Sequence, residues 1–271
     1  MENFLAESWR AVIFDYFWEN SYIMDLKFIF ILLFIMGFFI QILHSQTTYS
    51  IVAVDTITGE VGSAGASCVD LDRFGFETDD FVGELFPGAG AINTQAWYIP
   101  QNQQNASQKF ESGKTPDQIL QWLIKHDAED NPDFRQYGVV RMTENGVRAA
   151  AFTGDSTISY AGQIVGDYYA IQGNILSGRD VLERMEEAFL NTEGDLTCKL
   201  LAAMEAAAFP GADTRCLGNI TSSLFAYLKV ARPNDSKGKP SVLYSVRTAM
   251  GDEKEPVILL RDKMREAGLC R

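Results

Sequence analysis

The chain has 271 residues, 46% of them hydrophobic, and a formal net charge of −13 at pH 7. This acidic balance argues against nucleic acid as a partner, because no basic stripe is present to neutralise phosphates. It fits a domain with a solvated acidic surface. About 225 residues follow the apolar leader described next, which is enough for one large domain with a proper core.

The first segment with a clear character is the apolar run at residues 28–43. Its length suits the hydrophobic region of a signal peptide and is at the short end for a membrane span. Lys27 precedes it with a positive charge, and Ser45 follows it as a small residue for cleavage. We therefore expect residues 24–46 to be a signal peptide, cleaved near residues 45–47, and the mature protein to be periplasmic or secreted. In the alternative interpretation the run stays uncleaved as an anchor, the only contact with a membrane that we expect.

Residues 1–23 do not resemble part of that signal peptide. They carry Glu2, Glu7, Asp15 and Glu19 against the single Arg10. A signal peptide begins instead with a short basic region. We infer that translation starts at Met24 and that residues 1–23 are a misassigned upstream extension. A peptide from residues 1–23, detected by mass spectrometry of whole cells, would contradict this inference.

A predicted strand that opens with threonine follows the leader directly, at residues 48–55. If processing makes Thr48 the first residue, its hydroxyl can attack a carbonyl while its own α-amine takes the proton. The amine suits this role because its unperturbed pKa is about 7.7–8.0, close to working pH. The other interpretation is that threonine stands here only for its β-propensity.

Further along the chain, groups of strands alternate with pairs of helices. We predict strands at residues 49–55, 60–67, 89–95, 136–142, 147–153, 168–172, 222–231 and 241–248, and helices at 106–112, 115–126, 179–190, 196–209 and 256–267. An excursion loop is expected at residues 69–86. Two antiparallel sheets with a helix layer outside each would bury every apolar face. The predicted fold is therefore α+β, a four-layer α-β-β-α sandwich in a single domain at residues 47–271. A plain two-layer α+β domain is the alternative.

The four cysteines and two histidines limit the available chemistry. No CxxC or HExxH motif occurs, and His44 lies in the leader. We therefore expect neither a zinc site nor a histidine-based catalytic triad, and no metal or cofactor. Export would permit disulfides, for which four cysteines allow three full pairings.

A series of short motifs runs through the mature chain. They read TYSIVAVD at 48–55, TGEVG at 58–62, AS at 66–67, NTQA at 93–96, RQYGVV at 135–140, AFTG at 151–154, QGNIL at 172–176 and GADTR at 211–215. Over about residues 48–267, the ordered set resembles a bacterial family catalogued as domain of unknown function 1028. The resemblance implies the Ntn-hydrolase superfamily, whose fold is the α-β-β-α sandwich, and Thr48 as the candidate nucleophile.

One departure from the family pattern concerns the start of the domain. In the common family form, the matching threonine directly follows the initiator methionine. Here cleavage after Ser45 would leave Gln46 and Thr47 in front of Thr48. We therefore expect a further trimming or self-processing step if the protein is active.

Candidate catalytic residues surround the nucleophile in this interpretation. Thr48 would be both nucleophile and base, and Asp55 or Ser67 on the first hairpin would hold its amine. Asn174 and Gln95, which end strands, are candidates to stabilise the oxyanion. Each also has a structural interpretation: turn capping for Asp55, strand packing for Ser67, and turn hydrogen bonding for the other two.

Two further pairs lie close to these motifs. Asp213 and Arg215 are candidates to bind a substrate carboxylate, or they form a structural ion pair. Cys68 and Cys216 are expected to form a disulfide, with free buried thiols as the alternative.

The sequence thus predicts an exported amidohydrolase that cleaves a small amide or peptide-like substrate, and a homodimer would be compatible with it. The competing hypothesis is a non-catalytic secreted or cell-envelope binding domain on the same fold. A free Thr48 separates the two, because only the enzyme needs it.

Overall fold

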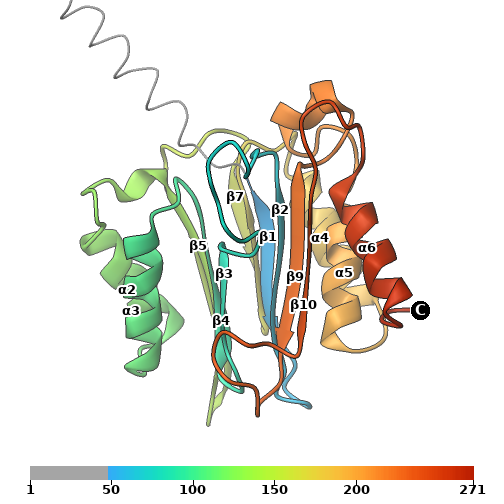
Figure 1. The fold of residues 1–271 in the computed structure, drawn as a ribbon. Helices are drawn as coiled ribbons and strands as arrows, with labels where there is room; N and C mark the ends of the chain where they lie inside the picture. Colours follow the sequence, from blue (N-terminus) through green and yellow to red (C-terminus); the bar gives the residue numbers. More distant parts are fainter. Residues whose placement is uncertain (1–47) are drawn as a thin grey trace, which may run out of the picture. The chain divides into compact units, whose positions relative to one another are not determined.

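Two antiparallel sheets stack face to face, with helices outside each of them (Figure 1). The computed structural model describes residues 48–271, which belong to one compact unit from Gln46 to Arg271. The expected upstream extension at 1–23 and the expected signal peptide at 24–46 lie outside the described residues. The arrangement agrees with the predicted layered α+β sandwich.

The larger sheet has six strands in the order β10-β9-β2-β1-β8-β7. The bounds are Tyr49–Val54 for β1, Val61–Ser67 for β2, Gly162–Val165 for β7, Tyr169–Gly173 for β8, Phe225–Ala231 for β9 and Val242–Arg247 for β10. The predicted hairpin of β1 and β2 is present, with Tyr49 opposite Ala66. Because β1 lies between β2 and β8, its first residues lie in the middle of the sheet rather than at an edge.

The smaller sheet has four strands in the order β3-β4-β5-β6. The bounds are Gly83–Phe86 for β3, Gly90–Ala96 for β4, Arg135–Thr143 for β5 and Gly146–Thr153 for β6. β3 falls within the residues expected to form a loop, and β7 was also not predicted. Each is only 4 residues long, which is too short for a clear strand period.

Five α-helices in the described part of the chain form the outer layers (Figure 1). α2 (Pro100–Glu111) and α3 (Pro116–Lys125) cover the smaller sheet, and α4 (Asp180–Asn191), α5 (Leu196–Ala206) and α6 (Pro256–Glu266) cover the larger one. α2 begins at Pro100, six residues before the predicted start. The sequence pattern missed these first turns because they are polar and show no apolar stripe. None of the helices within residues 48–271 has the length and apolar character needed to cross a membrane.

The strand period separates two hydrophobic layers around β1. Its odd-numbered residues pack with α4, α5 and α6, whereas Val52 and Val54 pack against the smaller sheet. On the helix side, Gly62 lies so close to α5 that a Cβ there would come within 2.4 Å of Leu200. The small residues of β2 therefore allow α5 to pack closely against the sheet.

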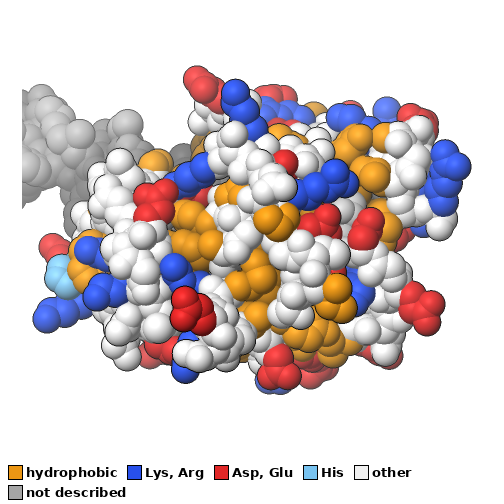
Figure 2. Space-filling model, turned by 90° about the horizontal axis from the view of Figure 1, so that it is seen from below, with side chains coloured by type: hydrophobic (Ala, Val, Ile, Leu, Met, Phe, Trp, Pro, Cys, Tyr) orange, Lys and Arg blue, Asp and Glu red, His pale blue; other side chains and the backbone are white. Residues whose placement is uncertain are grey.

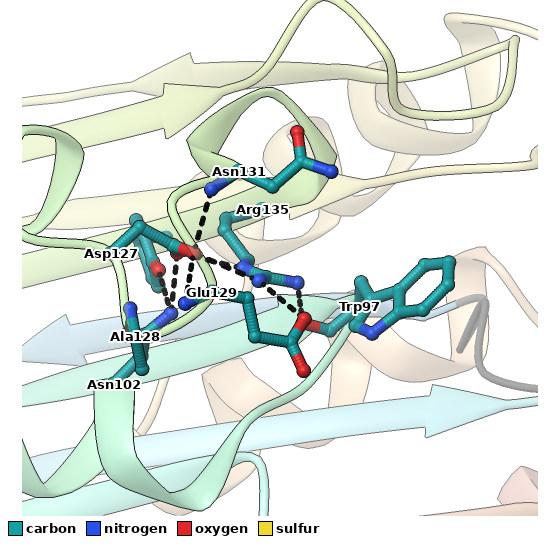
Figure 3. A network of polar contacts seen from close by, with 8 residues as sticks. Trp97, Asn102, Asp127, Ala128, Glu129, Asn131 and Arg135 are labelled. Carbon is teal, nitrogen blue, oxygen red and sulfur yellow. Dashed lines mark hydrogen bonds and ion pairs between the residues drawn. The ribbon is translucent and has the colours of Figure 1, made fainter. Parts of the chain in front are cut away.

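A buried ion pair anchors the loop between α3 and β5 (Figure 3). Arg135 is 1% exposed, and its Nε and Nη2 donate to the two carboxylate oxygens of Asp127 at 2.8 and 2.9 Å. The same guanidinium donates to the Trp97 carbonyl and to Glu129, both at 3.0 Å. Arg135 thereby joins the end of β4, the start of β5 and the intervening loop.

The Asp127 carboxylate is also bound from the helix side. Asn102 of α2 donates to it through Nδ2 at 2.6 Å, and the N–H groups of Glu129 and Asn131 donate at 3.0 and 3.1 Å. Burial by itself would raise the pKa of Asp127, but the hydrogen bonds from Arg135, Asn131, Glu129 and Asn102 lower it to about 2. The charged form is thus the one that the fold stabilises.

Arg135→Met should lower the free energy of unfolding by about 3–5 kcal/mol, because it leaves the buried Asp127 carboxylate without its cation. Urea unfolding followed by circular dichroism at pH 7 measures this loss. The matched control is Arg148→Met at an exposed position, expected to change stability by less than about 0.5 kcal/mol. Equal stabilities for the two variants would contradict the structural role of Arg135.

The depressed pKa of Asp127 predicts a pH dependence of stability. A carboxyl group whose pKa is lower in the folded than in the unfolded chain stabilises the fold above its unfolded pKa of 3.8 and loses this effect as the pH falls toward 2. The difference in unfolding free energy between the wild type and Asp127→Asn should therefore be constant from pH 7 to pH 5 and shrink toward pH 2. A difference that stays constant down to pH 2 would disprove this assignment.

Candidate functional site

Thr48 lies immediately before β1, at the end of the sandwich where β2 and β8 finish. It is 1% exposed. The strand period places its side chain on the same face as Ser50 and Val52, which is the face toward the smaller sheet. The Thr48 hydroxyl therefore belongs to the space between the two sheets.

The backbone of Thr48 is held from both sheets. Its carbonyl accepts a hydrogen bond from Nε2 of Gln95 in β4 at 3.0 Å and another from the N–H of Asn174 after β8 at 3.2 Å. These are two of the residues expected near the nucleophile. Because one donor comes from each sheet, the position of Thr48 depends on how the sheets stack.

Gln136 of β5 is the centre of this polar contact and is completely buried. Its Oε1 accepts from Nε2 of Gln95 at 2.7 Å and from Nδ2 of Asn174 at 3.1 Å. Its Nε2 lies within 2.9–3.0 Å of three acceptors, which are the Gly173 carbonyl, the Gly162 carbonyl and the Thr153 hydroxyl. Gln136 is not among the site residues predicted from sequence. The sequence signal that could have identified it is a polar residue at a position of a predicted strand whose side chain faces the protein interior.

Ser50 and Gln172 extend the network across the larger sheet. The Ser50 hydroxyl donates to Oε1 of Gln95 at 2.5 Å and accepts from Nε2 of Gln172 at 2.6 Å. Gln172 in turn lies over Gly138 of β5, where a Cβ would come within 2.0 Å of its Oε1. These residues, also not predicted, join β1, β8 and the smaller sheet through side chains alone.

Counting donors separates the roles of the two amides. A side-chain amide has two N–H hydrogens. Both hydrogens of Gln95 are used, on the Thr48 carbonyl and on Gln136. Gln95 therefore holds Thr48 and Gln136 with both of its amide hydrogens, and its role as an oxyanion donor stays a prediction. Asn174 uses one amide hydrogen on Gln136, and no acceptor within residues 48–271 takes the second, so Asn174 is still available for that role.

The two candidates on the first hairpin lie at opposite ends of it. The register that pairs Tyr49 with Ala66 brings the buried Ser67 next to Thr48. Asp55 follows the other end of β1, about 20 Å away at the usual rise of a strand. Its Oδ1 accepts from the N–H groups of Ile57 and Thr58 at 2.8 and 3.2 Å, so it caps the turn. The structure therefore does not bring Asp55 to the candidate site.

Asp213 and Arg215 lie at the Thr48 end of the sandwich, at the start of the short helix η2 (Thr214–Asn219). Asp213 is buried and accepts from the Cys68 N–H at 2.8 Å and from Nη2 of Arg215 at 3.2 Å. Burial raises the pKa of the Asp213 carboxyl, and the Arg215 guanidinium opposes this rise. The Arg215 side chain is 33% exposed, so it is the member of the pair that faces solvent.

Disulfides reinforce these connections. Cys68 is bonded to Cys216 with a Cα–Cα distance of 5.7 Å, which is the pairing expected from sequence. A second disulfide joins Cys198 of α5 to Cys270 near the carboxyl end. Asp195 lies beside this second disulfide and forms with it the one group of metal-type ligands found in the described residues, but bonded cysteines offer no thiolate to a metal.

The segment around Ile175 positions Asn174. Ile175 has a left-handed backbone, with φ +52°, which is unfavourable for a β-branched residue. Its N–H donates to the Ile158 carbonyl at 2.9 Å, and its own carbonyl accepts from the N–H and hydroxyl of Thr214 at 3.1 and 3.0 Å. The motif at 211–215 therefore stabilises the strained turn that follows Asn174.

Tyr49 fixes the start of β1 from the helix side. Its buried hydroxyl lies 2.7 Å from the Ser222 hydroxyl, which donates to Oε1 of Glu255 at 2.7 Å. Burial raises the pKa of Tyr49, and the nearby Glu255 adds to this effect, so the phenol is neutral. The start of β1 is thus held on both sides of the larger sheet, by the Tyr49–Ser222–Glu255 hydrogen bonds on the helix side and by Gln95 on the side of the smaller sheet.

The sequence profile of a family of unknown function, DUF1028, matches residues 48–260, and the chain belongs to this family. Among solved structures, the crystal structure of protein SPO2555 from Silicibacter pomeroyi, described as a DUF1028 protein, is similar with a TM-score of 0.63 and 23% sequence identity. The similarity covers 82% of this chain and 89% of that one, and at this identity it shows the fold alone. No curated protein matches the chain.

Gln136→Leu should destabilise the protein by about 3 kcal/mol or more, because it leaves several buried donors and acceptors unpaired. Gln136→Glu should not restore the lost stability, because its second carboxylate oxygen would face the Gly162 and Gly173 carbonyls in a buried site without a cation. The control is Gln121→Leu on the exposed face of α3, expected within about 0.5 kcal/mol of wild type. Urea unfolding measures all three, and a Gln136→Leu protein as stable as the control would refute the central role of Gln136.

Proposed function

We propose that this protein is an amidohydrolase of the Ntn type, in which processing makes Thr48 the amino-terminal nucleophile. The supporting observation is the position of Thr48 between the two sheets, with its carbonyl held by Gln95 and Asn174. A nucleophile held in a fixed geometry reacts faster than a mobile one. The family match begins at residue 48, which agrees with a functional domain that starts there.

In the proposed reaction, the Thr48 hydroxyl oxygen attacks the amide carbonyl carbon while the α-amine takes the hydroxyl proton. The second amide hydrogen of Asn174 would stabilise the oxyanion, and the Ser67 hydroxyl would orient the amine. Collapse of the tetrahedral intermediate breaks the C–N bond, and the α-ammonium gives its proton to the leaving amine. Water, deprotonated by the same amine, then attacks the Thr48 ester and breaks its C–O bond. The α-ammonium returns the proton to the Thr48 oxygen, and the carboxylic acid is released.

Arg215 suggests one feature of the substrate. Its side chain is 33% exposed and lies at the Thr48 end of the sandwich, where Nε and Nη2 donate to the buried Asp213. Guanidinium groups bind carboxylates in paired hydrogen bonds. We therefore infer a small amide or peptide-like substrate that carries a free carboxylate.

The disulfides support export. Both pairs of cysteines are bonded within the described domain. Such bonds persist in oxidising compartments and are rare in the cytosol. This agrees with removal of residues 24–46 and a periplasmic or secreted mature protein.

A non-catalytic binding domain is the second candidate. In the full chain Thr48 follows Thr47, so its nitrogen is an amide and cannot act as a base. A protein that keeps this form would retain the fold and its surfaces without turnover. The amino terminus of the mature protein therefore distinguishes the two candidates.

Amino-terminal sequencing of the protein from its native host should give Thr48 as the first residue. Thr48→Ala should then lower the hydrolysis of a carboxylate-bearing amide by about 10³-fold or more, whereas Thr48→Ser should retain part of it. Thr56→Ala, at an exposed turn position, is the control expected to keep full activity. A mature chain with residues still attached before Thr48, and no amide hydrolysis, would support the binding domain instead.

A further inference from the structure

The larger sheet is wider than the smaller one, which leaves part of its inner face to be covered by other segments. β10 extends beyond β3, the edge strand of the smaller sheet, and β3 covers β9 only in part. Next to the Thr48 end, Phe225 and Tyr227 of β9 are covered by the loop before β3. The inner face continues toward the other end of the sandwich with Lys229 and Ala231.

A cavity of about 260 Å³ lies beside Lys229 and Ala231. It is formed by β3, the end of β9, the 232–241 loop and β10. The residues that line it are Asp80, Gly83, Glu84, Leu85, Pro87, Lys229, Ala231, Ser236, Lys237, Gly238, Pro240 and Leu243. The hairpin loops of this end are seen in Figure 2, where apolar side chains are exposed between charged ones. Across β2, Lys229 lies level with Val52 in the middle of β1, and Ala231 lies level with Val54 at its far end. The cavity is therefore separate from the candidate catalytic site at Thr48.

Lys229 is the most buried charged side chain of the cavity, with 9% of it exposed. Its Nζ donates to Oδ2 and to the carbonyl of Asp80 at 2.7 and 2.9 Å. An ammonium group has three hydrogens. Among the described residues no oxygen or nitrogen accepts the third, and the ring centroid of Tyr227 lies 5.7 Å from Nζ. Burial lowers the pKa of Lys229 and Asp80 opposes this effect, so a further acceptor would stabilise the charged form.

Two carboxylates of the lining, Glu84 and Asp80, offer further oxygens. Lys237 is bound by Glu84 at 2.9 Å, by Glu111 at 2.6 Å and by Ser107 at 2.8 Å, so its three hydrogens are used. Within residues 48–271, no donor reaches Oε2 of Glu84 or Oδ1 of Asp80. The cavity thus combines one available donor, two available acceptors and an apolar wall that includes Leu85, Ala231 and Leu243.

We propose that this cavity binds a small zwitterion, an α-amino acid with a short aliphatic side chain. The carboxylate of the ligand accepts the third hydrogen of Lys229, and its ammonium group donates to Glu84 or Asp80. Its side chain contacts the apolar wall. Each lysine of the lining is already paired with a carboxylate, so the cavity has no unpaired charge that would favour an anion or a cation over a ligand with no net charge. The volume is below the usual range for drug-sized ligands, about 300–1,000 Å³, and agrees with a compact one.

Isothermal titration of the purified protein with L-leucine tests this proposal. We expect a Kd in the range of about 0.1–10 mM. Leucine analogues that lack one charged group, 4-methylpentanoate and 3-methylbutylamine, should bind at least tenfold more weakly. The same titration of Thr48→Ala should give an unchanged Kd, so the result is independent of the proposed hydrolase activity.

Two variants locate the binding. Lys229→Met should weaken L-leucine at least tenfold, and Leu243→Trp, which fills the rim from a half-exposed position, should do the same without removing a buried charge. Lys263→Met on α6, away from the cavity lining, is the matched control and should bind as wild type does. The proposal is overturned if L-alanine, L-valine and L-leucine all fail to bind at about 10 mM, or if both cavity variants bind as the control does.

Discussion

The hydrogen-bonded layer between the two sheets, centred on Gln136, is the interaction on which the rest of the candidate site depends. Polar groups away from water are stable only when they are paired, so their partners must meet in one geometry. Gln136 links Gln95 of the smaller sheet to Asn174 of the larger one. Both of these hold the Thr48 carbonyl. The same hydrogen bonds therefore fix both the stacking of the sheets and the position of Thr48.

The other half of the interface is apolar and has a different effect. Around Val52, Val54 and Val140, packing holds the sheets together without specifying their register in detail. The polar half fixes the register of the two sheets at the end of the sandwich where Thr48 lies. Its partners are completed by a strained turn at Ile175 and by the Cys68–Cys216 disulfide, which brings η2 against the end of β2. Rigid elements thus support the candidate nucleophile from several directions.

The unequal widths of the sheets have a second consequence. Where the smaller sheet ends, loops cover the inner face of β9, and a buried lysine remains beside a cavity. The sandwich therefore has two distinct polar regions, one around Thr48 and one around Lys229. Separate sites on one scaffold would allow a small ligand to bind without touching the proposed catalytic residues.

Local sequence patterns determined the hairpin of β1 and β2 and the layered fold, because strand and helix periods act over a few neighbours. They also placed Ser67, Gln95 and Asn174 close to Thr48, through the ordered family motifs. The tertiary structure alone decided which donor is free, since the amide hydrogens of Gln95 are used by partners that are distant in sequence. It also removed Asp55 from the site and introduced Gln136, Ser50 and Gln172. Hydrogen bonding between the sheets joins residues 37 to 47 positions apart, and within the larger sheet Gln172 reaches Ser50 across 122 positions. No local pattern records such contacts.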